Sequence, residues 1–239
     1  MVDIKLDGTK LQCETTATFL GITLDEHLTW ENHCNLVANK MSRNTGVLNR
    51  VKKILPSSSL LTIYNSLIAS HMYYGLEIWG ASSGKMVNRI SGIQKKAVRI
   101  ITKAHRLAHT EPRMKSLNIL KVADQHKLQC LSLTYDMMKK NCPDIYHFNL
   151  NRFANSANRE LRSTASQPDN IRESSLSSPW GKNSFPSLAP SYWNSIPDHV
   201  KQLMSRKAFK RAIKKLLLES YTERCNCENP LCVDGRYHH

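Results

Sequence analysis

The chain has 239 residues, enough for one large domain or two small ones, and its 41% hydrophobic content allows a sizeable core. Its 34 Lys and Arg outnumber 19 Asp and Glu, which gives a formal net charge of +15. Such an excess favours nucleic acid first and an anionic membrane surface second, with a merely soluble basic surface as the alternative. No apolar run approaches the roughly 18 residues that span a bilayer, and residues 1–5 lack a signal-peptide start. We therefore expect a soluble intracellular protein without a membrane partner.

The seven cysteines form an odd set, and four of them are scattered, which favours reduced thiols over a secreted disulfide framework. The other three, Cys225, Cys227 and Cys232, lie near His238 in a tail at 223–239. Thiolates and an imidazole are ligands that Zn²⁺ prefers. Zinc is therefore a candidate cofactor of this tail, and a thiol-bearing tail without metal is the alternative.

Residues 1–30 have the alternation and the turn signals of β-strands. Leu6 precedes the turn Asp7-Gly8, and β-branched residues surround a second apolar run that includes Phe19 and Ile22. This pattern predicts a short β-hairpin and a further strand. Because so small a sheet has an unpaired edge, we expect the segment to be a remnant of a larger sheet.

In residues 31–145 the apolar positions repeat with a helical period, which predicts a small bundle of helices with short connections. The second helix can be capped by Ser57 or Ser58, is apolar nearly all round and is expected to be central. A third helix follows from Lys85. A short helix and then a longer one from about Asp124 complete this unit.

Basic residues concentrate between residues 32 and 109, where twelve Lys and Arg accompany a single acid, Glu77. At about 100° per residue, those of the first and third helices fall in narrow sectors away from the apolar stripes. Such faces suit a polyanion, with nucleic acid the first candidate. The candidate nucleic-acid-binding residues are Lys40, Arg43, Arg50, Lys53, Lys85, Lys96, Arg99 and Lys103.

The C-terminal part divides into an irregular linker at 146–190, rich in Ser, Asn and Pro, and a helical segment at 191–222. In that segment Trp193 and Ile196 are expected to pack back onto the core, and Ser205 to cap an amphipathic helix. The apolar stripe of this helix comprises Phe209, Ile213, Leu216 and Leu217. Its outer face carries Lys207, Lys210, Arg211, Lys214 and Lys215. The expected fold class is therefore mainly α, with a short N-terminal β-hairpin.

Four short motifs occur in one order along nearly the whole chain. They are Phe19-Leu20-Gly21-Ile22-Thr23-Leu24-Asp25 with Leu28-Thr29-Trp30, then Tyr74 to Gly80, Ile93 to Arg99, and Trp193 to Pro197. In this order they resemble the C-terminal part of reverse transcriptases from non-LTR, LINE-type, jockey-like retrotransposons. The resemblance implies that Phe19, Leu20 and Gly21 belong to a primer-grip hairpin and that the following helices form a thumb.

The resemblance also implies what copying would require. Enzymes of this family hold two Mg²⁺ ions with an adjacent pair of aspartates and a third one upstream. The sequence contains no adjacent Asp-Asp pair. We therefore expect no catalytic residue in this chain, no Mg²⁺ without a palm domain, and no polymerisation by the chain alone.

These observations give one interpretation and two alternatives. We predict a fragment of a retrotransposon-derived RNA-directed DNA polymerase that binds an RNA or DNA duplex, such as a primer–template, without sequence specificity. The first alternative is a piece of an active reverse transcriptase whose palm is missing from a truncated gene model. The second is a helical domain reused to bind another protein. The sequence indicates no particular oligomeric state.

Overall fold

The computed structural model describes residues 5–7, 9–10, 14–139, 141, 170–171, 181 and 183–222. The strands of this part are β1 (Lys5–Leu6), β2 (Thr9–Lys10), β3 (Thr16–Phe19) and β4 (Ile22–Asp25). The helices are α1 (Glu31–Val51), α2 (Ser57–Ile63), the π-helical η1 (Tyr64–Ala69), α3 (Ser70–Tyr73), α4 (Leu76–Trp79), α5 (Gly84–Ile101), α6 (Glu111–Ser116), α7 (Val122–Met138), α10 (Phe185–Asn194), α11 (Asp198–Lys201) and α12 (Arg206–Glu219). The predicted mainly α fold with an N-terminal hairpin is confirmed.

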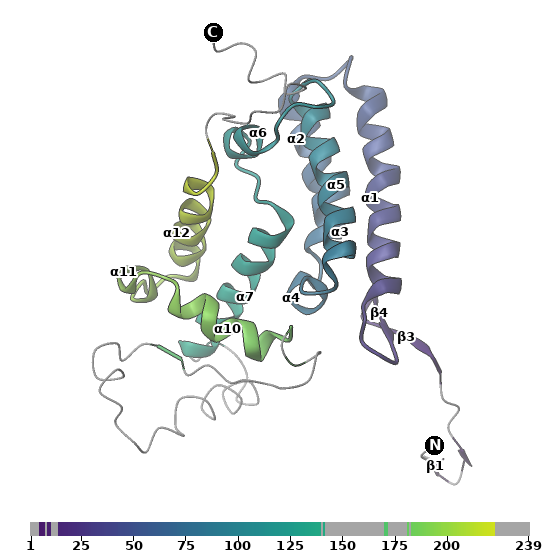
Figure 1. Ribbon diagram of the computed structural model, residues 1–239, viewed down its shortest axis with the longest axis vertical. Coiled ribbons are helices and arrows are strands. Elements are labelled where there is room, and N and C mark those ends of the chain that lie inside the picture. The colour runs from purple at the N-terminus through teal and green to yellow at the C-terminus, as the bar shows by residue number, and fades with distance from the viewer. Residues whose placement is uncertain are drawn as a thin grey trace.

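The long helices lie side by side along the long axis of the molecule (Figure 1). Helix α1 packs on α5, α5 on α7, and α7 on α12. Near its start, α5 places Arg89 beside Asn35 and Asn39 of α1, and the guanidinium donates to both side-chain amides. Because the end of α5 also lies beside the end of α1, these two helices run in the same direction.

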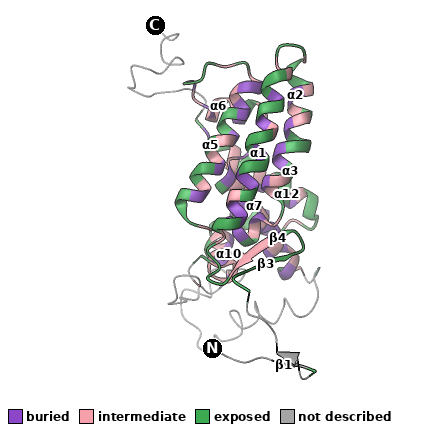
Figure 2. Cartoon of the chain, turned by 90° about the vertical axis from the view of Figure 1, so that its right-hand side faces the viewer, coloured by how far each residue is buried: buried purple, intermediate pink, exposed green. Residues whose placement is uncertain are grey.

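The core consists of the apolar stripes that the helical period predicts. Figure 2 marks the buried residues along the helices in purple. Met41 and Leu48 of α1, Ile90 of α5 and Tyr135 of α7 are fully buried. The polar Gln94 is also fully buried, and it donates its amide to the Tyr64 hydroxyl at 3.1 Å and to the Leu120 carbonyl at 2.8 Å. Gln94 thereby joins α5 to η1 and to the segment before α7.

Two predictions for the second helix are wrong. Helix α2 begins at Ser57 with Pro56 in the N-cap position, and the Ser57 hydroxyl donates to the Ile101 carbonyl at 3.0 Å instead of capping. The stretch is also not apolar all round, because Thr62, Asn65 and Ser66 form an exposed polar face. The hydroxyls of Thr62 and Ser66 each donate to the carbonyl four residues back, so this outer face is satisfied without burial.

The C-terminal segment closes the bundle as expected, with two corrections. Trp193 is buried and stacks on Phe209 of α12 at 5.9 Å between ring centroids. Helix α10 begins at Phe185, so the predicted linker boundary at residue 190 is wrong. Pro186 does not prevent the earlier start, because it lies in the first turn of the helix, where proline is tolerated. Leu216 of α12 is 37% exposed and does not belong to the buried stripe.

The N-terminal strands form two antiparallel hairpins in place of one hairpin and a lone strand. In the second, Phe19 pairs with Ile22, which leaves Leu20 and Gly21 as a two-residue turn. Both turn residues have positive φ, at 48° and 77°, as a type I′ turn requires. Leucine rarely adopts this conformation, so the tip of the hairpin is locally strained.

His33 ties this hairpin to the bundle. Its Nδ1 accepts the Thr23 amide proton at 3.3 Å, and its ring lies edge-on to Trp79 at 5.7 Å. Burial, with a further contribution from the nearby Lys40, lowers the pKa of His33. The folded chain therefore holds the ring neutral, as the hydrogen bond to Nδ1 demands.

Acidification should loosen this attachment. The pKa of His33 is lower in the folded chain than the usual value of 6.5, so below about pH 6.5 the unfolded chain binds more protons. The free energy of unfolding should therefore fall between pH 7.5 and pH 5.5, as urea titrations can measure. His33→Gln should reduce this dependence. An equal pH dependence in His33→Gln would contradict the assignment.

Candidate nucleic-acid interface

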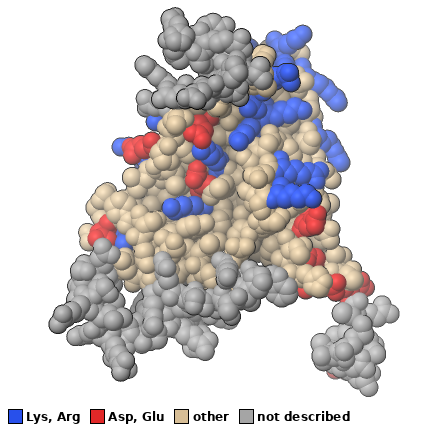
Figure 3. Space-filling model, in the orientation of Figure 1, with Lys and Arg blue, Asp and Glu red and all other residues tan. Residues whose placement is uncertain are grey.

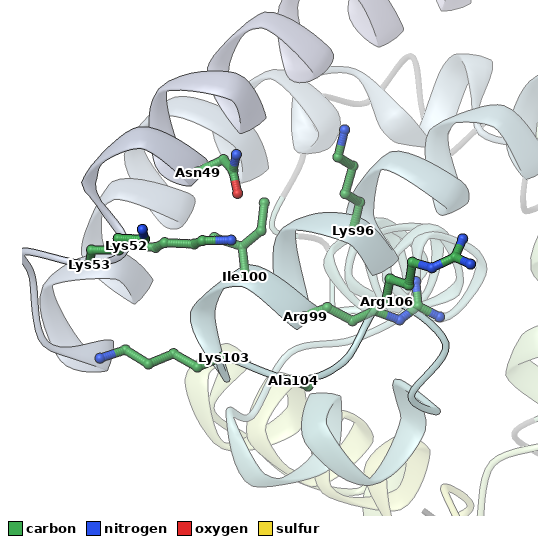
Figure 4. A pocket seen from close by; sticks show the side chains of 9 residues that line it. All are labelled: Asn49, Lys52, Lys53, Lys96, Arg99, Ile100, Lys103, Ala104 and Arg106. Carbon is green, nitrogen blue, oxygen red and sulfur yellow. The ribbon is translucent and has the colours of Figure 1, made fainter. Parts of the chain in front are cut away.

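A pocket of about 750 Å³ lies where the ends of α1 and α5 meet the loop that follows α5 (Figure 4). Its lining residues come from two stretches of chain about fifty residues apart. They are Asn49, Lys52, Lys53, Lys96, Arg99, Ile100, Lys103, Ala104 and Arg106. Ile100 and Ala104 supply an apolar part of the wall, and the remaining side chains are polar or positively charged.

The six cations of this lining set are accompanied by no Asp or Glu. Figure 3 shows Lys and Arg side chains gathered over the upper parts of α1 and α5. Charges within about 8 Å of one another are only partly screened at physiological salt, so their potentials add. A concave site of one sign concentrates ions of the opposite sign, and phosphate groups are the obvious ligands. We call this set of nine residues the basic pocket.

The end of α5 positions the floor of the basic pocket. The Ala104 amide donates to the Arg99 carbonyl at 2.9 Å and the Lys103 amide to the Ile100 carbonyl at 3.2 Å, which is the pattern of a Schellman C-cap. Lys103 occupies the left-handed position of this cap, with φ of 52°, where glycine is the usual residue. Arg99 is fixed in turn, because its Nε donates to the Ala108 carbonyl at 2.8 Å.

The Lys103 position allows a test that separates binding from folding. Lys103→Gly should leave the free energy of unfolding unchanged or raise it by up to about 1 kcal/mol, because glycine adopts positive φ without strain. The same change removes one cation, so duplex affinity should fall about tenfold. Urea denaturation and fluorescence anisotropy measure the two quantities. Unchanged affinity would show that Lys103 makes no phosphate contact.

Four of the eight predicted binding residues line the basic pocket: Lys53, Lys96, Arg99 and Lys103. The other four are exposed on the same two helices but lie outside it: Lys40, Arg43, Arg50 and Lys85. Arg99 differs from the prediction in being half-buried instead of facing away from the bundle. Their contacts with nucleic acid stay predictions.

Sequence reasoning missed two cations of the basic pocket, Lys52 and Arg106. Lys52 follows the last residue of α1 and is half-buried, so it falls outside the helical sector. Arg106 lies in the loop after α5, where no periodicity applies. Lys52 adjoins Lys53 and Arg106 lies three residues after Lys103, and this closeness in sequence is the signal that could have identified them.

The primer-grip-like residues lie at the other end of the bundle. The hairpin leads into the start of α1, whereas the basic pocket lies at its end, so about 30 Å of helix separates the two. Phe19 and Leu20 are 67% and 72% exposed. The Tyr74 hydroxyl donates to the Leu20 carbonyl at 2.6 Å, and a Cβ on Gly75 would meet Ile22 at 2.5 Å. The exposed turn of the hairpin is therefore held in place by close contacts with Tyr74 and Gly75.

The predicted zinc ligands lie outside the described residues, so Cys225, Cys227, Cys232 and His238 stay a prediction. Within the described part, no three His, Cys, Asp or Glu side chains group closely enough to hold a metal ion. Cys34 and Cys130 are buried there as free thiols, and burial raises the pKa of Cys130 to about 12. In the described segments, no helix combines the length and apolar character needed to cross a membrane.

Comparison with known proteins gives matches to polymerases of mobile elements from Drosophila melanogaster. The chain is 30% identical over 126 residues to the probable RNA-directed DNA polymerase from transposon BS, across 51% of this chain and 14% of that protein. The chain is related to the RNA-directed DNA polymerases of jockey-like mobile elements. For the probable polymerase from transposon X-element, identity is 34% over 90 residues, across 36% of this chain and 10% of that protein. For the polymerase from mobile element jockey it is 28% over 137 residues, 55% of this chain and 14% of that protein.

This relationship confirms the predicted resemblance to non-LTR reverse transcriptases over about half of the chain. The chain spans about a seventh or less of the length of these three polymerases. No family model matches the chain. No solved structure matches it significantly.

In the structure, residues of the four motifs lie at contacts between elements. The Asp25 carboxylate accepts the amide protons of Thr29 and Trp30, each at 2.9 Å. Partial burial acts to raise the pKa of Asp25, but these hydrogen bonds outweigh it and the pKa is lowered. Asn194 exchanges two hydrogen bonds of 2.9 Å with the backbone of Ile171. The motif residues thus stabilise the fold that carries the basic pocket.

Proposed function

We propose that this chain is a thumb-like part of an RNA-directed DNA polymerase and grips a nucleic-acid duplex through the basic pocket. The observation that carries the proposal is the convergence of six cations without an accompanying acid in one concave site. Lys and Arg at such a site bind phosphate oxygens, and contacts to phosphate hold a duplex without reading its sequence. The relatives are polymerases that copy RNA into DNA by name, which favours a primer–template as the ligand.

In this proposal the chain holds the nucleic-acid duplex and does not itself copy it. Transfer of a nucleotide needs carboxylates that hold two Mg²⁺ ions, and the sequence contains no adjacent pair of aspartates. We assign no catalytic residue to this chain. Where it acts beside a polymerase palm, its contribution is to keep the duplex in place.

The salt dependence of binding tests this function. Six phosphate contacts predict a slope of log affinity against log salt of about −5, or a loss of about 10³ between 50 and 200 mM salt. Fluorescence anisotropy with a 20-base-pair RNA–DNA hybrid measures the slope, and two hybrids of unrelated sequence should bind alike. An affinity that stays flat over this range would overturn the proposal and favour the reuse of the helical bundle for protein binding.

A further inference from the structure

Helix α12 carries a second basic surface that the proposed function does not use. At about 100° per residue, its five outer cations occupy a sector of about 140°, centred opposite the buried Phe209 and Ile213. These cations are Lys207, Lys210, Arg211, Lys214 and Lys215, of which Lys214 is half-buried and the other four are exposed. The only acid on α12 is Glu219, whose carboxylate lies 3.8 Å from the Lys215 ammonium. We call these five residues the α12 surface.

The α12 surface faces away from the basic pocket. Helix α12 packs on α7, which packs on α5, and α5 packs on α1. Figure 1 accordingly shows α12 and α1 on opposite sides of the bundle. The position of α12 is well fixed, because Phe209 stacks on Tyr135 at 4.5 Å and Arg206 pairs with Asp136 at 2.8 Å. A ligand on one basic surface therefore leaves the other accessible.

The chemistry of the α12 surface suits a nucleic-acid backbone. Its fourteen residues extend about 21 Å, which spans about six phosphates of one strand at about 3.4 Å per nucleotide. An amphipathic helix that binds an anionic membrane inserts its apolar face, but Phe209 and Ile213 of α12 are already buried against the bundle, which leaves Leu216 as the exposed residue of that face. A charged backbone needs no such apolar contact.

We infer that the α12 surface is a second nucleic-acid-binding site, so that one molecule holds two nucleic-acid segments at once. The inference rests on the proposed function for the first segment, which binds in the basic pocket. The second segment lies along α12 and is held by phosphate contacts alone, without sequence preference. Simultaneous occupation joins two duplexes, or two parts of one long molecule, across the width of the bundle.

A bridging assay tests the inference. One biotinylated duplex is immobilised, the full chain is added, and retention of a second, fluorescent duplex of unrelated sequence is measured. The wild-type chain should retain the second duplex. The variant Lys207→Gln/Lys210→Gln/Lys214→Gln should reduce retention at least tenfold, because glutamine keeps the helix but removes three charges. Circular dichroism of the variant checks that the helix still forms.

Binding to a single duplex separates this inference from the proposed function. The α12 variant should keep its affinity within about threefold at low protein concentration, where the basic pocket dominates. Full affinity combined with lost bridging supports the inference. Bridging that survives in the α12 variant overturns it, because a dimer joined through another surface would then account for the retention. If pocket variants lose binding to a single duplex but the wild-type chain does not bridge two duplexes, the proposed function is retained and the second site is rejected.

Discussion

Replacing Lys53 and Lys96 together by glutamate should lower the affinity for an RNA–DNA duplex about 100-fold at 0.15 M salt. The two side chains line the basic pocket from different helices and are both exposed, so folding does not depend on their charge. Each charge-assisted contact to phosphate contributes about a factor of ten, and glutamate adds repulsion. The salt slope should change from about −5 to between −3 and −4, because two of six contacts are lost. Fluorescence anisotropy measures both quantities.

The matched control reverses the same number of charges outside the basic pocket. Lys40 and Lys85 lie on the same two helices and are also exposed, but neither lines the pocket. Lys40→Glu/Lys85→Glu changes the net charge equally and should lower affinity less than tenfold. Equal losses in the two variants would mean that binding responds to overall charge and that the basic pocket is no distinct site.

Gly80→Ala should lower the free energy of unfolding by about 3 kcal/mol. Gly80 is the C-cap residue of α4, which packs on α7. A Cβ at this position would clash with the Leu76 carbonyl and lie 2.5 Å from the His126 ring. His126 is itself buried, so it has little room to move. Forcing a methyl group into a packed contact typically costs 1–3 kcal/mol, and here part of the obstacle is backbone. Urea denaturation followed by circular dichroism measures the change.

Gly92→Ala is the control for this variant. Gly92 lies inside α5 and is exposed, with nothing within 4 Å of an added Cβ. Alanine is the better helix former, so Gly92→Ala should raise the free energy of unfolding by about 1 kcal/mol. If Gly80→Ala lowers the free energy of unfolding and Gly92→Ala raises it, the loss at Gly80 comes from the close contact with His126 and not from the replacement of a glycine as such. A neutral Gly80→Ala would show that α4 can move away from α7.

The fold was predictable wherever burial follows a local period. Met41 and Leu48 of α1 and Ile90 and Ile101 of α5 are buried at the helical spacing that the sequence shows, because each stripe depends on residues of one helix. Predictions were wrong where a distant segment decides the outcome. Ser57 bonds to Ile101 instead of capping its own helix, and nothing near Ser57 in the sequence indicates that partner.

The sequence by itself determined that the chain is basic, mainly helical and related in its motifs to reverse transcriptases. It also placed the cations of α1 and α5 on helix faces, because side-chain direction follows from residue number within a helix. Only the tertiary structure decided which of these cations meet. The two helices run in the same direction with their ends in register, so Lys53 and Lys96 share one pocket while Lys40 and Lys85 do not. The packing of α1 against α5 sets which of their residues lie side by side. The helical period describes residues within one helix and cannot predict this register.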